Sequence, residues 1–272
     1  MVNNITISIV TATFNSESVI GKTVASVLMQ DYKLYEHIII DNCSSDKTLE
    51  LITEMYKNTG KESCLVIISE KDTGIANAFN KGIQRATGEV ILLLNADDEL
   101  TSPRQLTDTN KVFQNPEILF TYGSIKFLDD QHGSNIRKPL LCKVTEGGPY
   151  HHPGMFIRKT VYETYGLYDE SYRYSMDYEM FARLEKQIDN FRERGHQFTE
   201  YPVAIMRAGG ASYKQGIASV HEAKRLLQQH QYWGAKASWH YTLRLTREYV
   251  KQILDVLGLK LLVRIWRKFK WS

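Results

Sequence analysis

The chain has 272 residues, of which 43% are apolar and 24% charged, with 6 prolines. This composition is typical of globular proteins, so long disordered stretches are not expected, and the length fits one α/β domain with an extension. The formal net charge of +3, from 34 basic and 31 acidic residues, is too small to favour nucleic acid as a partner.

Nothing in the sequence predicts secretion or a membrane span. The N-terminus has no basic segment followed by a cleavable apolar stretch, and no apolar run approaches the roughly 20 residues that a spanning helix needs. The three widely spaced cysteines fit neither a disulfide framework nor a paired metal site. We therefore expect a cytoplasmic protein, either soluble or peripheral on the cytoplasmic face of a membrane.

Short apolar strands alternate with helices through the first half of the chain. Strand patterns cover residues 5–10, 36–40, 65–68 and 90–94, and helical patterns cover 17–29, 47–56 and 74–85. Such strands, apolar throughout and separated by helices, predict a mostly parallel central sheet flanked by helices. Ligands bind beyond the carboxyl ends of the strands in sheets of this kind. One rim should therefore gather residues 11–15, Asp41, Asp72 and 95–98.

The second half alternates less regularly. We expect strands over 119–127 and 155–157, and helices over 159–165 and 177–185. From about residue 217 the pattern becomes helical, with a break at Gly258. The sequence therefore predicts a sheet domain over 1–210 and a helical C-terminal extension over 211–272.

Two adjacent carboxylates, Asp97 and Asp98, follow the apolar run 90–94. They repel each other unless a cation or ligand hydroxyls compensate, and Mg²⁺ or Mn²⁺ prefers such oxygen ligands. The alternative is a solvated acidic turn that caps the next helix through Thr101 or Ser102.

Asp41 and Asp72 could each be an N-cap, or could accept from the N–H of a nucleobase. The rim that they share with Asp97 and Asp98 favours a binding site.

Five segments occur in order along the chain: 8–15, 38–46, 69–75, 79–83 and 94–98. Together they resemble the family 2 glycosyltransferases, which are inverting enzymes of the GT-A fold. The resemblance is dense over the first hundred residues and resumes around 154–184. It implies transfer of a sugar from a UDP-sugar to a hydroxyl of a glycan or lipid-linked acceptor in polysaccharide biosynthesis.

The resemblance also implies roles for single residues. Asp98 would ligate a Mn²⁺ or Mg²⁺ ion that bridges the donor diphosphate, and Asp97 would approach the ribose or the metal. The remaining donor-side positions that match the family are Thr11, Thr13, Asn15 and Glu17 around the nucleoside, Asp41 on the base with Asp72 beside it, and Lys81.

Inversion needs a base that deprotonates the acceptor hydroxyl. The segment 174–184 resembles the acidic motif that the family carries at a helix start, and it places Asp177 as this base. Glu179 is the second candidate, although two residues farther along a helix its side chain should point elsewhere. The alternative is that Asp177 only caps the helix and that Arg183 pairs with Glu179.

Two further segments could contact acceptor or phosphate. His151 and His152 lie in a stretch that we expect to be extended, where neighbours point to opposite faces, so at most one should face the site. His152 is the candidate, or else an ordinary structural histidine. Arg207 precedes a glycine pair and could clamp the diphosphate, or could belong to a plain surface turn.

The C-terminal part is basic, apolar and rich in tryptophan. Eight lysines and arginines between residues 243 and 272 are interleaved with apolar residues that include Trp266 and Trp271. This pattern favours an interfacial helix on an anionic membrane. A helix packed on the domain with a solvated basic face, or a contact in a homo-oligomer, are the alternatives.

Two other functions are compatible with a nucleotide-binding α/β sheet. A nucleotidyltransferase would be expected to carry a glycine-rich basic loop after the first strand, and residues 11–16 do not form one. A catalytically inactive scaffold subunit that binds nucleotide sugar would be suggested by loss of Asp98 or Asp177, and both are present.

Overall fold

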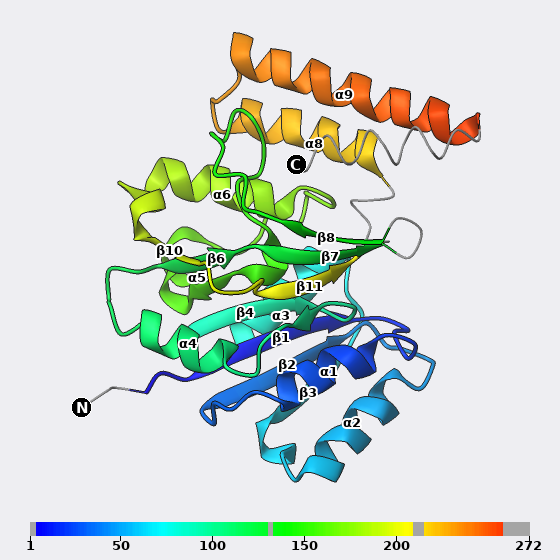
Figure 1. Ribbon diagram of the computed structural model, residues 1–272, viewed down its shortest axis with the longest axis vertical. Coiled ribbons are helices and arrows are strands. Elements are labelled where there is room, and N and C mark those ends of the chain that lie inside the picture. Colours follow the sequence, from blue (N-terminus) through cyan, green and yellow to red (C-terminus); the bar gives the residue numbers. More distant parts are fainter. Residues whose placement is uncertain (1–3, 130–132, 209–214, 258–272) are drawn as a thin grey trace.

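The computed structural model describes residues 4–129, 133–208 and 215–257, which form two β-sheets surrounded by helices (Figure 1). The strands are β1 (Ile7–Thr13), β2 (Tyr35–Asp41), β3 (Leu65–Ser69), β4 (Val90–Asn95), β5 (Glu99–Leu100), β6 (Phe120–Gly123), β7 (Ile125–Asp129), β8 (Gly133–Arg137), β9 (Phe156–Arg158), β10 (Gly195–Phe198) and β11 (Ala204–Arg207). The helices are α1 (Ile20–Leu28), α2 (Thr48–Thr59), α3 (Ile75–Arg85), α4 (Gln105–Val112), α5 (Lys159–Tyr165), α6 (Met176–Gln187), α8 (Gly216–Gln229) and α9 (Ala235–Val256). Short 3-10 turns occur at η1 (Glu62–Cys64), η2 (His152–Gly154) and η3 (Phe191–Arg194).

The larger sheet has the strand order β10-β6-β9-β4-β1-β2-β3, in which β3, β2, β1 and β4 are parallel neighbours. β9 runs antiparallel between β4 and β6. The register aligns Thr13 with Asp41, Asp41 with Ser69, and Ala12 with Asn95. The mostly parallel sheet is confirmed, and the carboxyl ends of its central strands meet at one rim as predicted.

The smaller sheet has the order β5-β11-β7-β8 and corrects one prediction. The single strand expected over 119–127 is two strands, because β6 belongs to the larger sheet and β7 to the smaller one. Where they meet, a Cβ on Gly123 would lie 2.5 Å from Val203, and the Val203 N–H donates to Ser124 O at 2.8 Å. At this point the chain passes from the larger sheet to the smaller one. The apolar pattern of residues 119–127 predicts a single strand, so it does not reveal the change of sheet.

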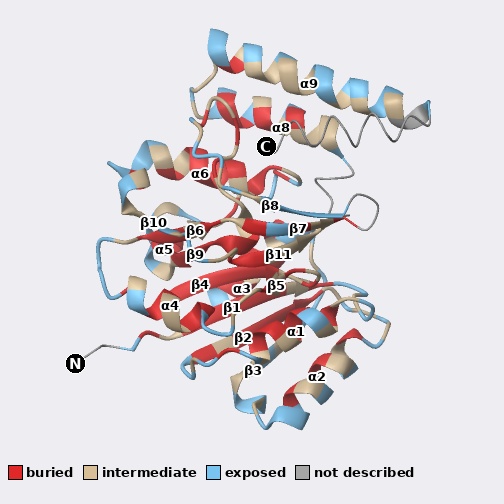
Figure 2. Cartoon of the chain, viewed as in Figure 1, coloured by how far each residue is buried: buried red, intermediate tan, exposed pale blue. Residues whose placement is uncertain are grey.

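Alternating residues of the central strands pack against helices on the two faces of the large sheet (Figure 2). Val10 and Ile38 lie in the same cluster as residues of α3, α5 and α6, whereas Ile9 and Ile39 pack on the opposite face with α1, α2 or α4. Gly82 allows α3 to pack closely on β1, because a Cβ at this position would lie 2.1 Å from a Val10 methyl. Burial on both faces fixes the strands and therefore the rim that they form.

The helical extension packs on this domain. α8 lies against α6, and Ala223, Leu226 and Leu227 of α8 join the main apolar cluster (Figure 1). α9 lies on α8 and contributes Ala237 to the same cluster. The predicted division at residue 210 falls within 209–214, and Gly258 with the rest of 258–272 also lies outside the described residues. Within the described ranges, no helix is both long and apolar enough to cross a membrane.

Candidate functional site

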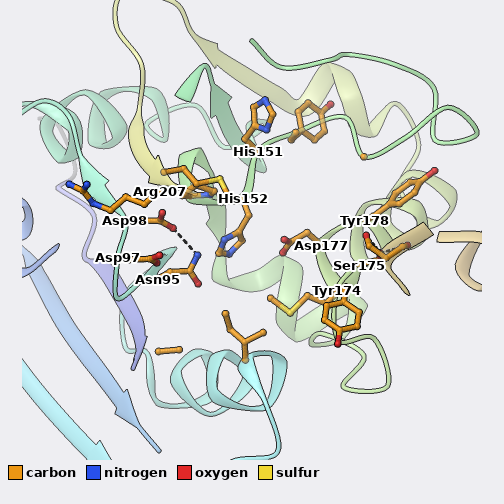
Figure 3. A pocket seen from close by; sticks show the side chains of 18 of the residues that line it. Asn95, Asp97, Asp98, His151, His152, Tyr174, Ser175, Asp177, Tyr178 and Arg207 are labelled. Carbon is orange, nitrogen blue, oxygen red and sulfur yellow. Dashed lines mark hydrogen bonds between the residues drawn. The ribbon is translucent and has the colours of Figure 1, made fainter. Parts of the chain in front are cut away.

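A cavity of about 730 Å³ opens beyond the carboxyl ends of β1 and β4 (Figure 3). Its walls come from the turn after β4, from η2, from the start of α6, from the end of β11 and from α9. Five of the residues singled out from the sequence line it: Asp97, Asp98, His152, Asp177 and Arg207. Residues that are up to 110 positions apart in the chain are thus gathered around one space.

Asp98 is buried at the wall of this cavity, with 1% of its surface exposed. Its Oδ2 accepts a hydrogen bond of 2.7 Å from Asn95 Nδ2. Burial and then the neighbouring charge of Asp97 raise the pKa of Asp98 to about 8, against the opposing bond from Asn95. Burial also raises the pKa of Asp97, which the charge of Arg207 partly offsets. The burial of Asp98 argues against a fully solvated acidic turn at this position.

The two carboxylates are suited to a hard divalent ion that a substrate also helps to bind. Within the described residues, no group of three or more His, Cys, Asp or Glu side chains could hold a metal by itself. An ion here would therefore take one or two oxygens from Asp98 and Asp97 and complete its shell with phosphate oxygens and water, as Mg²⁺ commonly does. Its charge would relieve the repulsion that keeps these carboxyls from ionising together.

Asp177 lies on the opposite side of the cavity, as the second residue of α6 (Figure 3). Its Oδ1 is buried and has no hydrogen-bond partner among the described residues. Burial raises the pKa of Asp177, whereas the charge of His152 and hydrogen bonding from Tyr168 lower it. No side-chain bond caps α6, whose N-cap residue is Ser175. The alternative that Asp177 serves only as a helix cap is therefore not supported.

Both adjacent histidines line the cavity, and their rings point in different directions (Figure 3). The backbone of His151 is extended, and the 3-10 turn η2 begins at His152. His152 lies near the centre of the cavity, with its ring 5.2 Å from that of Phe79 (Figure 3). His151 lies at the edge, where its Nε2 is 3.0 Å from Lys138 O.

Glu179 points away from the cavity, as its position on the helix predicts. It is 1% exposed and accepts from Arg183 Nε at 3.1 Å. His230 Nε2 lies 2.9 Å from the same oxygen. Glu179 thus joins α6 to His230, the residue that follows α8, and it does not line the cavity.

Arg207 reaches past Asp98 and away from Asp177 (Figure 3). Its guanidinium forms an ion pair of 2.5 Å with Glu99. The residue lines the cavity at the end of β11, while the glycines at 209 and 210 lie outside the described ranges.

The positions predicted around the nucleoside lie beside the cavity and organise the loops at the rim. Asn15 Oδ1 accepts from the Ser45 N–H at 2.9 Å, and Glu17 Oε2 accepts from the Lys47 N–H at 3.0 Å. These bonds join the loop after β1 to the loop after β2. Farther inside, the Thr11 hydroxyl contacts a buried histidine, and the buried Thr13 hydroxyl has no partner among the described residues.

Asp41 is placed differently from the expectation. It is fully buried, and its oxygens accept from the Ser44 hydroxyl at 2.5 Å, the Ser44 N–H at 3.0 Å and the Ser69 hydroxyl at 2.6 Å. In this arrangement its carboxylate holds the ends of β2 and β3 together and does not present a surface to a base. Its neighbour Asn42 is half-buried, and its Oδ1 accepts from the Asp72 N–H at 3.0 Å.

Asp72 and Lys81 also make local bonds outside the cavity. Asp72 accepts from the Gly74 N–H at 2.9 Å just before α3, and burial raises its pKa. Lys81 forms an ion pair of 2.9 Å with Glu70.

Several residues of the site were not identified from the sequence. Arg137, Arg173 and Arg244 line the cavity, and Glu222 holds the segment that leads into α6. The Glu222 carboxylate accepts from three consecutive backbone N–H groups, those of residues 173, 174 and 175, at 2.9, 2.8 and 2.9 Å. No local pattern marks Glu222 and Arg244, because tertiary packing alone brings α8 and α9 to the site.

Residues 8–176 match the model of a protein family described as "Glycosyl transferase family 2". A Methanococcus voltae protein named dolichyl N-acetyl-alpha-D-glucosaminyl phosphate 3-beta-D-2,3-diacetamido-2,3-dideoxy-beta-D-glucuronosyltransferase is 29% identical over 202 residues. That alignment covers 66% of this chain and 62% of the relative, so the chain spans about three fifths of the relative's length.

Two solved structures share the fold. S. aureus TarS 1-349 in complex with UDP-GlcNAc has a TM-score of 0.65 at 16% identity, covering 92% of this chain and 73% of that one. The mannosyltransferase PcManGT from Pyrobaculum calidifontis, in complex with GDP-Man and Mn2+, has a TM-score of 0.66 at 15% identity, covering 98% and 83%. With its match to the family over residues 8–176 and its GT-A fold, the chain belongs to glycosyltransferase family 2.

Proposed function

We propose that the protein is an inverting glycosyltransferase that moves a sugar from a UDP-sugar to a hydroxyl of a glycan or lipid-linked acceptor in polysaccharide biosynthesis. One observation carries the proposal. A buried carboxylate with an unpartnered oxygen, that of Asp177, faces the Asp97–Asp98 pair across a single cavity. An inverting transfer needs a base on one side of the reacting carbon and a site for the leaving diphosphate on the other.

In this mechanism Asp177 accepts the proton of the acceptor hydroxyl. The oxygen then attacks the anomeric carbon of the donor as the bond to the diphosphate breaks, and UDP leaves. Burial raises the pKa of Asp177, which makes its carboxylate a stronger base than that of an exposed aspartate. The His152 ring, which is tilted against that of Phe79, lies between Asp98 and Asp177 (Figure 3) and would limit how the acceptor can approach.

Asp98, with Asp97, would hold a Mn²⁺ or Mg²⁺ ion. The ion would supply positive charge for the departing diphosphate. The solved neighbour in complex with GDP-Man and Mn2+ supports a metal of this kind. Our preference for a UDP-sugar is supported by the neighbour in complex with UDP-GlcNAc.

A lipid-linked acceptor agrees with the surface of α9. Four large apolar side chains at its C-terminal end are 45% to 64% exposed: Tyr249, Val250 and Ile253 of α9, and Leu257, which follows the helix. Arg247 and Lys251 lie on the same turns. This combination is typical of a helix that rests on an anionic membrane, and the Methanococcus voltae relative is named for a dolichyl phosphate substrate. We therefore propose peripheral membrane contact through α9.

The function is tested by incubating the protein with a panel of nucleotide sugars and Mn²⁺, Mg²⁺ or chelator, with and without acceptor extracts. We expect metal-dependent release of UDP, and Asp177→Asn should lower kcat by about 10²- to 10⁴-fold while UDP still binds. Release of pyrophosphate would indicate a nucleotidyltransferase instead. Tight binding of UDP without any turnover would indicate an inactive scaffold subunit.

Membrane contact is tested by sedimentation with vesicles of neutral or anionic lipid. The protein should bind anionic vesicles, and Ile253→Glu together with Leu257→Glu should abolish this binding. If these substitutions leave vesicle binding unchanged but convert a dimer to a monomer in solution, the face is an oligomer contact.

A further inference from the structure

A second cavity of about 480 Å³ adjoins the one that contains the proposed base. It lies between the loop around residues 140–148 and the helices α8 and α9. The two cavities share three wall residues, Gly148, Ser219 and Arg244. Glycine has no side chain and serine a small one, so only Arg244 contributes a large side chain to this shared boundary.

The shared boundary lies next to the start of α6. The Ser175 hydroxyl donates to Ser219 O at 3.1 Å, and the two hydroxyl oxygens are 3.3 Å apart. Ser175 is the N-cap residue of α6 and precedes Asp177 by two positions. It lies beyond Asp177 as seen from Asp98 (Figure 3). The second cavity therefore begins on the side of the base that is remote from the carboxylate pair.

The walls of the second cavity carry hydrogen-bonding groups of both kinds. Carboxylates only accept hydrogen bonds, guanidinium groups only donate them, and a hydroxyl does both. The apolar wall residues are Leu140, Val220 and Leu243. The polar ones are Glu146, Ser219, His240, Arg244, Arg247 and Glu248.

Both carboxylates of this cavity are held by neighbouring groups. The Glu146 carboxylate pairs with Lys236 at 2.5 Å. The Glu248 carboxylate pairs with Lys251 at 3.7 Å, and it packs so closely on the start of α8 that a Cβ on Gly216 would lie 2.2 Å from its Oε2. Neither lysine lines the cavity. Side chains that the fold already holds lose less conformational freedom when they bind a ligand.

This mixture of donors and acceptors matches the hydroxyl groups of a sugar. Each sugar hydroxyl both donates and accepts, so it can meet a carboxylate and a guanidinium or imidazole at once. The carbon-bound hydrogens of a sugar ring can pack on the apolar walls. A purely apolar chain would leave the polar walls without partners, which costs free energy. The volume of about 480 Å³ also falls within the roughly 300 to 1,000 Å³ that is typical of small-molecule sites.

We propose that the second cavity binds the sugar unit next to the one that receives the transferred sugar, so that the acceptor is a glycan of at least two units. The inference rests on the proposed glycosyl transfer and names the class of its acceptor. The hydroxyl at Asp177 belongs to the terminal unit of this glycan, which lies in the first cavity with the donor. The next unit extends past Gly148 and Ser219 into the second cavity, where the polar walls hydrogen-bond to its hydroxyls.

The test is direct binding of saccharides to the protein saturated with UDP and Mn²⁺, measured by calorimetry. The probes are methyl glycosides of common hexoses and N-acetylhexosamines, with disaccharides and trisaccharides built from the same units. At least one disaccharide should bind about tenfold or more tightly than its own monosaccharide, because the second unit adds hydrogen bonds in the second cavity.

Two variants assign this gain to the second cavity, and their readout is the ratio of disaccharide to monosaccharide affinity. Gly147 lines the second cavity and not the first, and a Cβ there would meet only Cys142 Sγ, at 3.9 Å. Gly147→Leu should therefore fill part of the second cavity and remove the gain. His240→Ala deletes one polar wall group and should lower the ratio by about twofold to tenfold. His221→Ala on α8 removes a histidine outside both cavities, so this matched control should keep the wild-type ratio.

The proposal would be overturned if no probe bound, or if every longer saccharide bound no more tightly than its monosaccharide. It would also fail if Gly147→Leu and His240→Ala kept the wild-type ratio, because the added unit would then lie elsewhere. His240→Ala keeps the test valid if Gly147→Leu does not fold. The measurement needs no turnover, so the proposed binding site can fail while the transfer assay succeeds. Release of pyrophosphate in that assay would refute glycosyl transfer whatever the ratio.

Discussion

His152 and Asp177 both point into the site, and each has one buried polar atom without a hydrogen-bond partner among the described residues (Figure 3). The His152 Nε2 and the Asp177 Oδ1 are both buried, both residues line the cavity, and neither atom has a hydrogen-bond partner among the described residues. Buried polar atoms are nearly always paired in folded proteins. Two unpaired atoms at one cavity indicate that a ligand group, such as the acceptor hydroxyl, completes the arrangement.

Replacing His152 should change the pH dependence of turnover. The charge of His152 lowers the pKa of Asp177, so His152→Gln should raise that pKa. Because the base works only when deprotonated, the acid limb of the kcat profile should move to higher pH. Profiles of kcat against pH for the two proteins measure the shift. An acid limb at the same pH in both would show that His152 does not influence the base.

Replacing Glu222 should slow turnover without weakening the donor site. Glu222 accepts the three backbone N–H groups that precede α6, so it positions the helix start that carries Asp177. Glu222→Ala should lower kcat by about tenfold with little change in the KM for the donor, and Glu222→Gln, which retains one acceptor oxygen, should be intermediate.

The positioning role of Glu222 is separable from a purely structural one by measuring Tm alongside the kinetics. A lower Tm with unchanged kcat at a temperature where the variant is fully folded would contradict the prediction. Arg225→Gln, one turn along α8, removes a bond to the Ser171 carbonyl and is the control on the same helix.

Asp41 should matter to stability more than to the donor. Its carboxylate accepts three hydrogen bonds from Ser44 and Ser69 in a fully buried position. Asp41→Asn should lower the free energy of unfolding by about 1 to 3 kcal/mol, measured by urea denaturation. The half-buried neighbour supplies the comparison, because Asn42→Ala loses one bond to a backbone N–H and should cost less. If the Asp41→Asn protein had normal stability and a raised KM for the donor, Asp41 would instead bind the nucleobase of the donor.

His37 should make the protein sensitive to acid. It is buried between the Thr11 hydroxyl at 2.9 Å and the Tyr56 hydroxyl at 2.6 Å, and burial lowers its pKa from 6.5 to about 3. The unfolded chain therefore binds a proton that the folded one does not, between pH 6.5 and about 3. The stabilisation that comes from keeping His37 neutral is fully present above pH 6.5. As the pH falls from 6.5 toward about 3, this stabilisation is lost by about 1.4 kcal/mol per pH unit.

Unfolding free energies at pH 7, 6 and 5 for wild type and His37→Gln measure this contribution. The glutamine does not titrate in this range, so its stability should fall less steeply with pH than that of wild type. Parallel pH dependences in the two proteins would assign the acid sensitivity to other groups.

The sequence was informative about the rim because strand ends are a local property. Asp97 and Asp98 lie just beyond the end of β4, and in a parallel sheet that position fixes the edge on which they lie. The sequence does not predict in which direction a side chain at the rim points. Asp41 and Asn42 are adjacent, and only packing against β3 decides that the carboxylate turns inward to Ser69.

The residues on the acceptor side of the cavity could not be predicted from the sequence, for a different reason. Arg244 and Glu222 reach the site from helices that follow the sheet domain, through contacts of α8 with α6 and of α9 with α8. Such long-range packing leaves no periodicity or motif near either residue. The basic pattern of α9 was visible and indicated a membrane, but it did not distinguish the arginine that lines the cavity from those that face outward.

The bond from Glu222 to the residues before α6 has a consequence for protein engineering. The family match ends at residue 176, one position before the proposed base, and the side chain that holds this region in place comes from residue 222. A chimera that joins this donor half to another acceptor half should therefore take α6, α8 and α9 from a single parent. A junction placed between α6 and α8 would combine a base helix with a partner that did not evolve to hold it.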